Sequence, residues 1–97
     1  MKRVLIVSDD LRSLIRHLPP TLKGKIKRAL EEIVTEPATG KALRDELVGL
    51  RSYRIGNIRI VYHPEEKSVT LITVGPRKSI YQKAALELKR RAEHPSR

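Results

Sequence analysis

Arginines recur in the segment from Leu50 to Tyr62, which reads LRSYRIGNIRIVY. Gly56-Asn57 separates two runs that are rich in β-branched and aromatic residues, and glycine at the first loop position is typical of a type II′ hairpin turn. With this two-residue loop, Arg54 faces Arg59 across the hairpin. Like charges directly opposite each other destabilise a strand pair by up to about 1 kcal/mol, so this pairing suits a surface that binds an anion.

Side chains alternate between the two faces of a strand, so the hairpin has one apolar and one charged face. The apolar face is expected to carry Tyr53, Ile55, Ile58 and Ile60. Arg54 and Arg59 share the other face with Val61 and His63, and we expect this face to be concave and partly open.

A second basic group follows the next apolar run, where Arg77 and Lys78 precede Tyr81. Ser79 and Gln82 have the S-x-x-Q spacing of a capping box, which predicts that the last helix opens here. A helix N-terminus offers free N–H groups to an anion, and arginine binds phosphate in a bidentate manner. Together with Arg54 and Arg59, these residues could bind a scissile phosphate and stabilise its transition state. The alternative is that Tyr81 belongs to the core and the arginines are ordinary surface charges.

Other kinds of site find little support in the sequence. The three histidines, at positions 17, 63 and 94, lack the spacing of metal ligands, and no cofactor is implied. There is no G-x-S-x-G motif, no glycine-rich phosphate loop and no cysteine. Tryptophan and phenylalanine are also absent, which excludes the stacked aromatic platform of an RRM or OB-type binder.

The remaining pattern predicts one α+β domain over residues 1–97, with a frayed tail from about residue 93. The expected order is β-α-α-β-β-β-α, a mostly antiparallel sheet with two N-terminal helices on one face and a C-terminal helix. The expected elements are a strand at 3–7, helices at 8–18 and 20–35, the hairpin, a strand at 68–75 and a helix from 79. Residues 41–49 are compatible with either a helical turn or an irregular lead-in to the hairpin.

Two details of packing can be predicted further. Placing Tyr62 opposite Val69 would continue the apolar face of the sheet into the last strand. The last helix would then turn an inner stripe toward the sheet and expose a basic flank that includes Lys83. The stripe consists of Tyr81, Ala85, Leu88 and Ala92.

The chain carries a net charge of +10, and residues 77–97 contribute seven basic and two acidic groups to it. Such a charge favours polyanionic partners, and the alternative is a solubilising charged surface. No apolar run approaches the roughly 18 residues of a membrane span, and none suits a signal peptide, so we expect a cytoplasmic protein without membrane contact.

The motifs Y-R-I-G-x-x-R-I-V-Y (residues 53–62) and V-G-x-R-x-x-x-Y (residues 74–81) resemble the RelE/ParE superfamily of toxins from type II toxin–antitoxin systems. With the two N-terminal helices, the resemblance covers nearly the whole chain. It is closest to RelE-like mRNA interferases. It implies a ribosome-dependent, metal-independent endoribonuclease that cleaves mRNA codons in the A site and so inhibits translation. A cognate antitoxin and the mRNA-bound ribosome are the implied partners.

By motif position, the resemblance assigns charge stabilisation to Arg54, Arg59 and Arg77. It assigns Tyr81 to the 2′-hydroxyl, which attacks the adjacent phosphate and leaves a 2′,3′-cyclic phosphate and a 5′-hydroxyl. Arg51, Lys78 and Lys83 are candidate RNA-binding residues.

This chain departs from the family in one respect, because Gly56 stands where the best-known members have a second lysine. The general acid is therefore open. His63, which we expect to lie near Arg59, could protonate the leaving 5′-oxygen, or it could be a plain surface histidine.

Two other functions remain compatible with the sequence. One is a ParE-like toxin that inhibits DNA gyrase without cutting RNA. The other is a non-catalytic member that only binds RNA or its antitoxin. The C-terminal tyrosine favours the endoribonuclease, since an inhibitor needs no acid–base group at that position.

Overall fold

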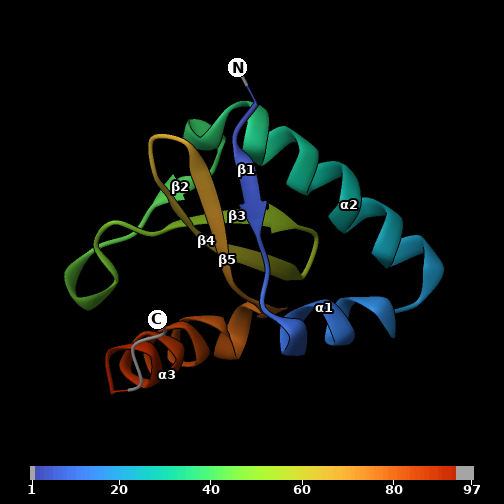
Figure 1. Ribbon diagram of the computed structural model, residues 1–97. Coiled ribbons are helices and arrows are strands. Elements are labelled where there is room, and N and C mark those ends of the chain that lie inside the picture. Colours follow the sequence, from blue (N-terminus) through green and yellow to red (C-terminus); the bar gives the residue numbers. More distant parts are fainter. Residues whose placement is uncertain (1, 94–97) are drawn as a thin grey trace.

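The computed structural model describes residues 2–93 and forms an α+β domain with a five-stranded sheet (Figure 1). The helices are α1 (Asp9–Arg16), α2 (Pro20–Thr35) and α3 (Arg77–Glu93), with short 3₁₀ turns η1 (Pro37–Thr39) and η2 (Asp45–Leu47). The strands are β1 (Val4–Ile6), β2 (Lys41–Ala42), β3 (Arg51–Ile55), β4 (Ile58–Pro64) and β5 (Ser68–Pro76). The predicted order is therefore confirmed, and the undecided segment 41–49 holds both β2 and η2.

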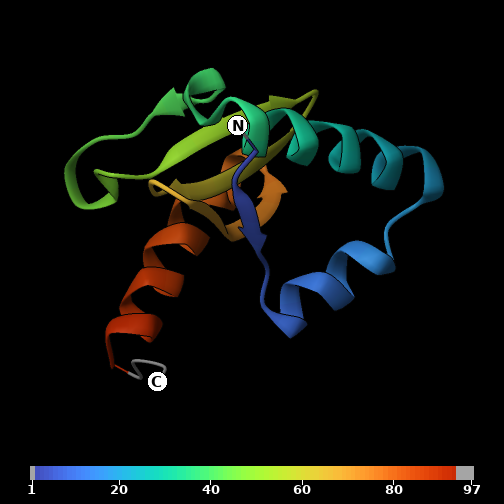
Figure 2. The ribbon, with the colours of Figure 1, turned by 45° about the horizontal axis from the view of Figure 1, so that its top comes forward.

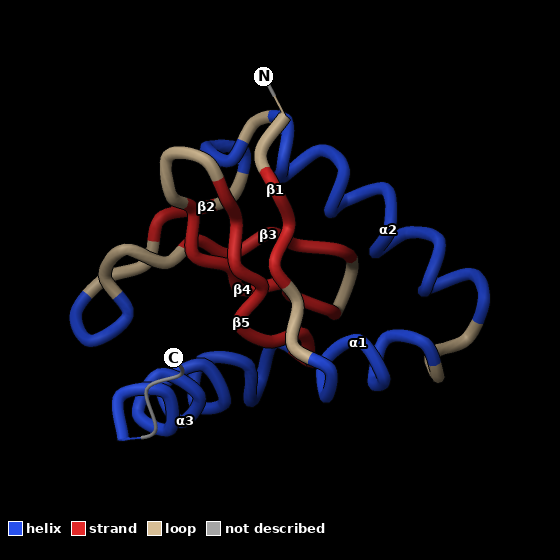
Figure 3. The backbone as a smooth tube through the Cα atoms, viewed as in Figure 1, coloured by secondary structure: helices blue, strands red, loops and turns tan. Residues whose placement is uncertain are grey.

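The sheet has the strand order β1-β5-β4-β3-β2 (Figure 3). Only β1 runs parallel to its neighbour, β5, and the other strand pairs are antiparallel. The predicted hairpin register is confirmed, because Arg54 pairs with Arg59 and Ile55 with Ile58. Gly56 has a φ of +56° while Asn57 is not among the residues with positive φ, as a type II′ turn requires.

The predicted register between β4 and β5 is wrong. Tyr62 pairs with Leu71, and Val69 pairs with Pro64. The turn between β4 and β5 is longer than the predicted register requires, because four residues, 65–68, lie between the paired Pro64 and Val69. A β-bulge after Val61, where β5 carries one more residue than β4, shifts the register by one further residue toward the hairpin. The bulge has no marker in the sequence, such as a glycine, that would have revealed it.

Helices α1 and α2 cover one face of the sheet (Figure 2). Ser8 caps α1, since its hydroxyl accepts a hydrogen bond from the Leu11 backbone at 3.2 Å. Leu11 is buried, but Leu14 of the predicted apolar face remains 48% exposed. The core on this face is built from Leu11, Ile26, Ala29, Ile33, Val34, Ile60, Tyr62, Val69, Leu71 and Val74.

The other face of the sheet carries a second core beneath α3, where we expected an open surface. This smaller core consists of Leu47, Leu50, Val61, Ile72, Ile80 and Ala84. The inner stripe of α3 is therefore Ile80 and Ala84, both fully buried, and not the predicted set. Tyr81, Ala85 and Leu88 flank this stripe, whereas Ala92 is exposed.

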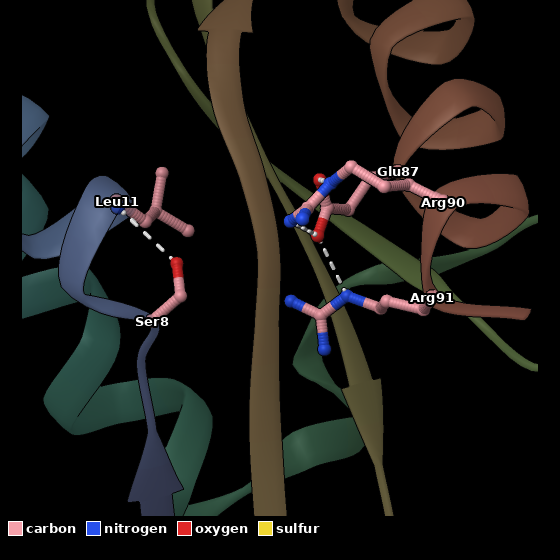
Figure 4. Close-up of polar contacts among 5 residues, drawn as sticks. All are labelled: Ser8, Leu11, Glu87, Arg90 and Arg91. Atoms are coloured by element: carbon pink, nitrogen blue, oxygen red, sulfur yellow. Dashed lines mark hydrogen bonds and ion pairs between the residues drawn. The ribbon is translucent and has the colours of Figure 1, made fainter. Parts of the chain in front are cut away.

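The predicted capping box is also wrong. α3 begins at Arg77, directly after β5, so Ser79 lies inside the first turn and not at the N-cap. Near the other end, Glu87 accepts hydrogen bonds from Arg90 at 2.7 Å and Arg91 at 2.8 Å (Figure 4). Burial opposes ionisation of Glu87, but these hydrogen bonds outweigh it and lower its pKa. Part of the basic charge of α3 is thus neutralised within the helix.

Among residues 2–93, no helix is long and apolar enough to cross a membrane. The predicted frayed tail lies outside the described residues beyond Glu93, which is the last residue of α3.

Candidate functional site

The candidate site lies where the hairpin turn, the end of β5 and the start of α3 meet. Its centre is a hydrogen bond between Arg59 and Tyr81, with 3.3 Å between Nη1 of the guanidinium and the phenolic oxygen. Both side chains are half-buried between the sheet and α3. The bond joins two residues that are 22 positions apart and holds the hydroxyl of Tyr81 over the charged face of the sheet.

Arg54 stands beside Arg59 on the neighbouring strand, at the distance of directly paired residues, about 4.5–5.5 Å between Cβ atoms. Its side chain is exposed, and its Nε donates to the carbonyl of Gly56 at 3.3 Å. The two guanidinium groups therefore separate, one toward the hairpin turn and one toward α3. This geometry reduces their mutual repulsion and leaves the remaining N–H groups of Arg54 free to bind an anion.

Arg77 is brought to the same place by the backbone. Its N–H donates to the carbonyl of Asn57 at 3.1 Å, which ties the first turn of α3 to the hairpin loop. Arg77 and Lys78 are both exposed. A helix normally favours acidic residues at its N-terminus, so two cations there are unfavourable until an anion binds.

Lys83 approaches the site from α3 across Gly75. A Cβ built on Gly75 would lie 3.4 Å from Nζ of Lys83 and 3.5 Å from Cδ1 of Ile80. Gly75 pairs with Arg59, so the lysine lies over the strand next to Arg59. A row of positive charge thus crosses three neighbouring strands, from Arg54 through Arg59 to the lysine above β5.

Two of the predicted residues lie elsewhere. Arg51 lies near Tyr62 on the α2 side of the sheet, where its guanidinium donates to the carbonyls of Gly40 at 2.8 Å and Ala38 at 3.1 Å. His63 is four residues from Arg59 along β4, which corresponds to about 13 Å at the rise of a strand. The expected closeness of His63 to Arg59 is therefore wrong, and fully buried Val61 lies between them.

The ring of Tyr81 lines a groove of about 400 Å³ between α3 and the segment that includes η2. Leu43, Leu47 and Ala85 contribute apolar surface to this groove, and its charged lining residues are Arg44, Asp45 and Glu46. The sequence did not reveal the groove, because residues 41–49 have no clear periodicity. The role of Gly75 was missed as well, since Gly75-Pro76 was interpreted only as the end of a strand.

The cations of the site form no ion pairs with acidic side chains. Within residues 2–93, the ion pairs of the structure join only Glu87 to Arg90 and Arg91, so the cations of the site are unpaired. The same residues contain no group of three histidine, aspartate or glutamate side chains that could hold a metal ion. Such an arrangement can bind a phosphodiester, stabilise added negative charge and direct one hydroxyl at it.

Known proteins were compared with this chain by sequence and by fold. The model of the family described as ParE toxin of type II toxin–antitoxin system, parDE, matches residues 7–81. Among curated proteins, no sequence matches the chain.

Among solved structures, the fold is similar to the toxin–antitoxin complex RelBE2 from Mycobacterium tuberculosis, with a TM-score of 0.69 and 27% identity over 79% of this chain and 100% of that one. A mutant E. coli RelE toxin in the free state gives a TM-score of 0.74 and 23% identity over 93% of this chain and 98% of that one. The intact E. coli RelBE complex gives 0.64 and 25%, covering 76% and 95% of the two chains.

Proposed function

Because this chain belongs to the ParE toxin family of type II toxin–antitoxin systems, within the RelE/ParE superfamily, we propose that it is a toxin that cleaves mRNA on the ribosome. The reaction would need no metal. The 2′-hydroxyl of one nucleotide attacks the adjacent phosphate, and the products are a 2′,3′-cyclic phosphate and a 5′-hydroxyl. Action on the ribosome would also place the protein in the cytoplasm.

The hydrogen bond between Arg59 and Tyr81 is the observation that supports this proposal most. A phosphate bound by Arg59 would lie within reach of the Tyr81 oxygen, which could then orient the 2′-hydroxyl or accept its proton. In a protein that only binds nucleic acid, a tyrosine hydroxyl beside the phosphate-binding arginine would add one phosphate contact. In a nuclease it would also supply the group that acts on the 2′-hydroxyl.

The other cations would act on the charge that develops during the reaction. Arg54 and Arg77 approach the same phosphate from the hairpin and from the start of α3. Guanidinium groups remain charged at all physiological pH values and bind two phosphate oxygens at once. They would stabilise the two negative charges of the pentacovalent transition state more than the single charge of the substrate.

Programmed ribosomes provide the direct test. Purified, antitoxin-free protein is incubated with ribosomes that carry a defined mRNA, and the RNA ends are mapped by primer extension. Cuts within the A-site codon are expected, with 5′-hydroxyl ends and without a requirement for divalent metal beyond that of the ribosome itself. Intact mRNA under conditions where the protein is folded and toxic would rule the proposal out.

Inhibition of DNA gyrase is the second candidate, because the matching family model is that of ParE. Supercoiling assays with purified gyrase distinguish the two functions. Loss of supercoiling together with intact mRNA would favour the gyrase inhibitor, whereas unchanged supercoiling together with A-site cuts favours the endoribonuclease.

The proposed partner in the resting cell is an acidic antitoxin segment. RelB is the second component of the RelBE complexes to which the fold is similar. In this chain, unpaired cations surround Tyr81, so an acidic segment bound there would neutralise the charge and block the phosphate site together.

A further inference from the structure

We infer that Lys83, whose ammonium lies over Gly75, is the general acid that protonates the leaving 5′-oxygen. This inference rests on the proposed endoribonuclease function. It fills a role that neither the arginines nor Tyr81 fills in that mechanism.

The need for such a group follows from the chemistry of the site. When the 2′-oxygen forms its bond to phosphorus, the bond from phosphorus to the 5′-oxygen breaks and its electron pair stays on that oxygen. The oxygen then needs a proton to leave as a hydroxyl. Arginine does not give up a proton in proteins, so Arg54, Arg59 and Arg77 are excluded as donors. His63 is excluded by its distance of about 13 Å from Arg59 along the strand.

A lysine ammonium does carry transferable protons, and Lys83 is in the right place. Its Nζ lies 3.4 Å from the point where a Cβ of Gly75 would be. Gly75 is the strand partner of Arg59, so the ammonium lies over the strand next to the arginine proposed to bind the phosphate. Lys78 and Lys83 are both exposed, but of the two only Lys83 has its Nζ near Gly75 of the sheet.

The positions of Lys83 and Tyr81 also fit the geometry of the reaction. Attacking and leaving oxygens lie roughly in line on opposite sides of the phosphorus, so a base and an acid must approach from opposite sides. Residues two positions apart on a helix point about 200° apart. Tyr81 accordingly turns toward the groove beside η2, and Lys83 turns toward β5, on either side of buried Ile80.

Protonation by Lys83 accounts for the 5′-hydroxyl product. One proton moves from Nζ of Lys83 to the 5′-oxygen, which yields the 5′-hydroxyl and a neutral amine. The amine recovers its proton from water before the next turnover.

The test uses a leaving group that needs no protonation. Ribosomes are programmed with an mRNA whose scissile 5′-oxygen is replaced by sulfur, since a thiolate leaves readily without a general acid. Lys83→Ala is expected to cleave normal mRNA about 10²-fold or more slowly than the parent protein. On the sulfur-substituted mRNA it should cleave at nearly the parent rate.

Two further variants separate proton donation from charge. Lys83→Arg keeps the positive charge without a transferable proton, so it should be as slow as Lys83→Ala on normal mRNA and equally restored by sulfur. Lys78→Ala removes a neighbouring cation and should affect both substrates by the same factor.

Several results would overturn the inference. Equal slowing of Lys83→Ala on both substrates, or full activity of Lys83→Arg on normal mRNA, would show that Lys83 contributes only charge. If the parent protein cleaves neither substrate, the proposed endoribonuclease function itself is wrong. If the parent protein is active but sulfur substitution does not restore cleavage by the Lys83 variants, only the role of Lys83 is wrong.

Discussion

The hydroxyl groups of the three tyrosines have different surroundings, and each has a different role. Tyr53 donates to the Glu32 carboxylate at 2.7 Å on the α2 side of the sheet. Tyr62 is fully buried and joins two backbone groups. Tyr81 alone is held by a cation, Arg59, at the edge of a groove. Among the three, only Tyr81 has its hydroxyl bound to a cation of the candidate site.

Removing the Tyr81 hydroxyl should affect catalysis without affecting the fold. Tyr81→Phe keeps the ring and is expected to slow A-site cleavage by about 10²-fold or more, in the range of lost acid–base groups. Tyr53→Phe is the matched control, because it also removes a hydrogen-bonded hydroxyl but does so on the opposite face of the sheet. Primer extension against time measures both rates, and equal rates for the two variants would contradict the role of Tyr81.

Removing the Tyr62 hydroxyl should affect stability. This hydroxyl donates to the Pro37 carbonyl at 2.6 Å and accepts from the Gly40 N–H at 3.0 Å. Tyr62→Phe leaves both buried groups without a partner, which is expected to cost about 1–3 kcal/mol of unfolding free energy. Urea titration followed by circular dichroism measures the difference, and an unchanged midpoint would contradict the importance of these two bonds.

Burial raises the pKa of Tyr62 above its ordinary value of 10.0, and this has a consequence at high pH. Below pH 10 the phenol is protonated in both states and its contribution to stability is complete. Above pH 10 the unfolded chain releases the proton while the folded chain retains it, so stability falls as pH rises toward the folded pKa. Urea titrations at pH 8 to 11 should show a smaller loss for Tyr62→Phe, although Tyr53, whose pKa is also raised, retains part of the effect.

At the scale of the elements, the loop between α2 and β3 is organised around Gly40. A Cβ at this position would meet the Ser52 carbonyl at 2.9 Å as well as the hydroxyl of Tyr62. This loop presents the segment that forms one wall of the Tyr81 groove, so its packing also shapes the candidate site.

A pair of glycine substitutions tests this packing. Gly40→Ala is expected to destabilise the protein by about 1–3 kcal/mol, since neither the backbone carbonyl nor the buried tyrosine can move easily. Gly24→Ala is the control within α2, where the nearest atom is the flexible end of Arg28 at 3.9 Å. It should stabilise the helix by about 0.5–1 kcal/mol. Thermal unfolding measures the stability of both variants. An unchanged stability of Gly40→Ala would show that the loop can move to accommodate the added methyl group.

The hairpin and α2 were predictable from sequence because local rules govern them. A two-residue loop fixes the pairing of Arg54 with Arg59, and Pro20 together with the residues before Pro37 sets the ends of α2. The relation of α3 to the sheet was not predictable in this way. It depends on the bulge after Val61 and on a helix that continues from β5 without a loop, and both are tertiary features.

The same distinction applies to the site. Motif position predicted Arg54, Arg59, Arg77 and Tyr81, and the structure brings them together at one end of the sheet. His63 lies farther from Arg59 along β4 than expected. The approach of Lys83 to Gly75 depends on how α3 packs on the sheet, which no local pattern shows. The catalytic roles themselves stay a prediction.

At the scale of the whole molecule, the net charge of +10 includes some cations that form ion pairs and others that do not. Arg90 and Arg91 are paired within α3, whereas the cations around Tyr81 have no acidic partner among the described residues. Because Arg54, Arg59 and Arg77 are also gathered at one end of the sheet, we expect RNA to bind mainly there and not through the protein surface in general.

Salt dependence tests this distribution. For single-stranded RNA, each phosphate contact contributes about 0.7 to the slope of log affinity against log salt. Replacing Arg54, Arg59 and Arg77 by alanine should thus reduce the slope by about 2. A control with three exposed cations of α1 and α2 replaced, namely Arg12, Arg16 and Lys27, should leave it nearly unchanged. Fluorescence anisotropy at several salt concentrations measures both, and equal slopes would indicate non-specific attraction.

The parallel pairing of β1 with β5 has a consequence for synthesis of the chain. Val4 pairs with Ser68, so the first strand made finds its partner only after most of the protein has been translated. Arg77 and Tyr81 emerge later still. A nascent chain therefore has neither a finished sheet nor a complete site until residues 68–81 have left the ribosome, and we expect chains arrested before residue 68 to stay sensitive to protease. The proposed nuclease activity would accordingly appear only after these residues have folded onto the rest of the chain.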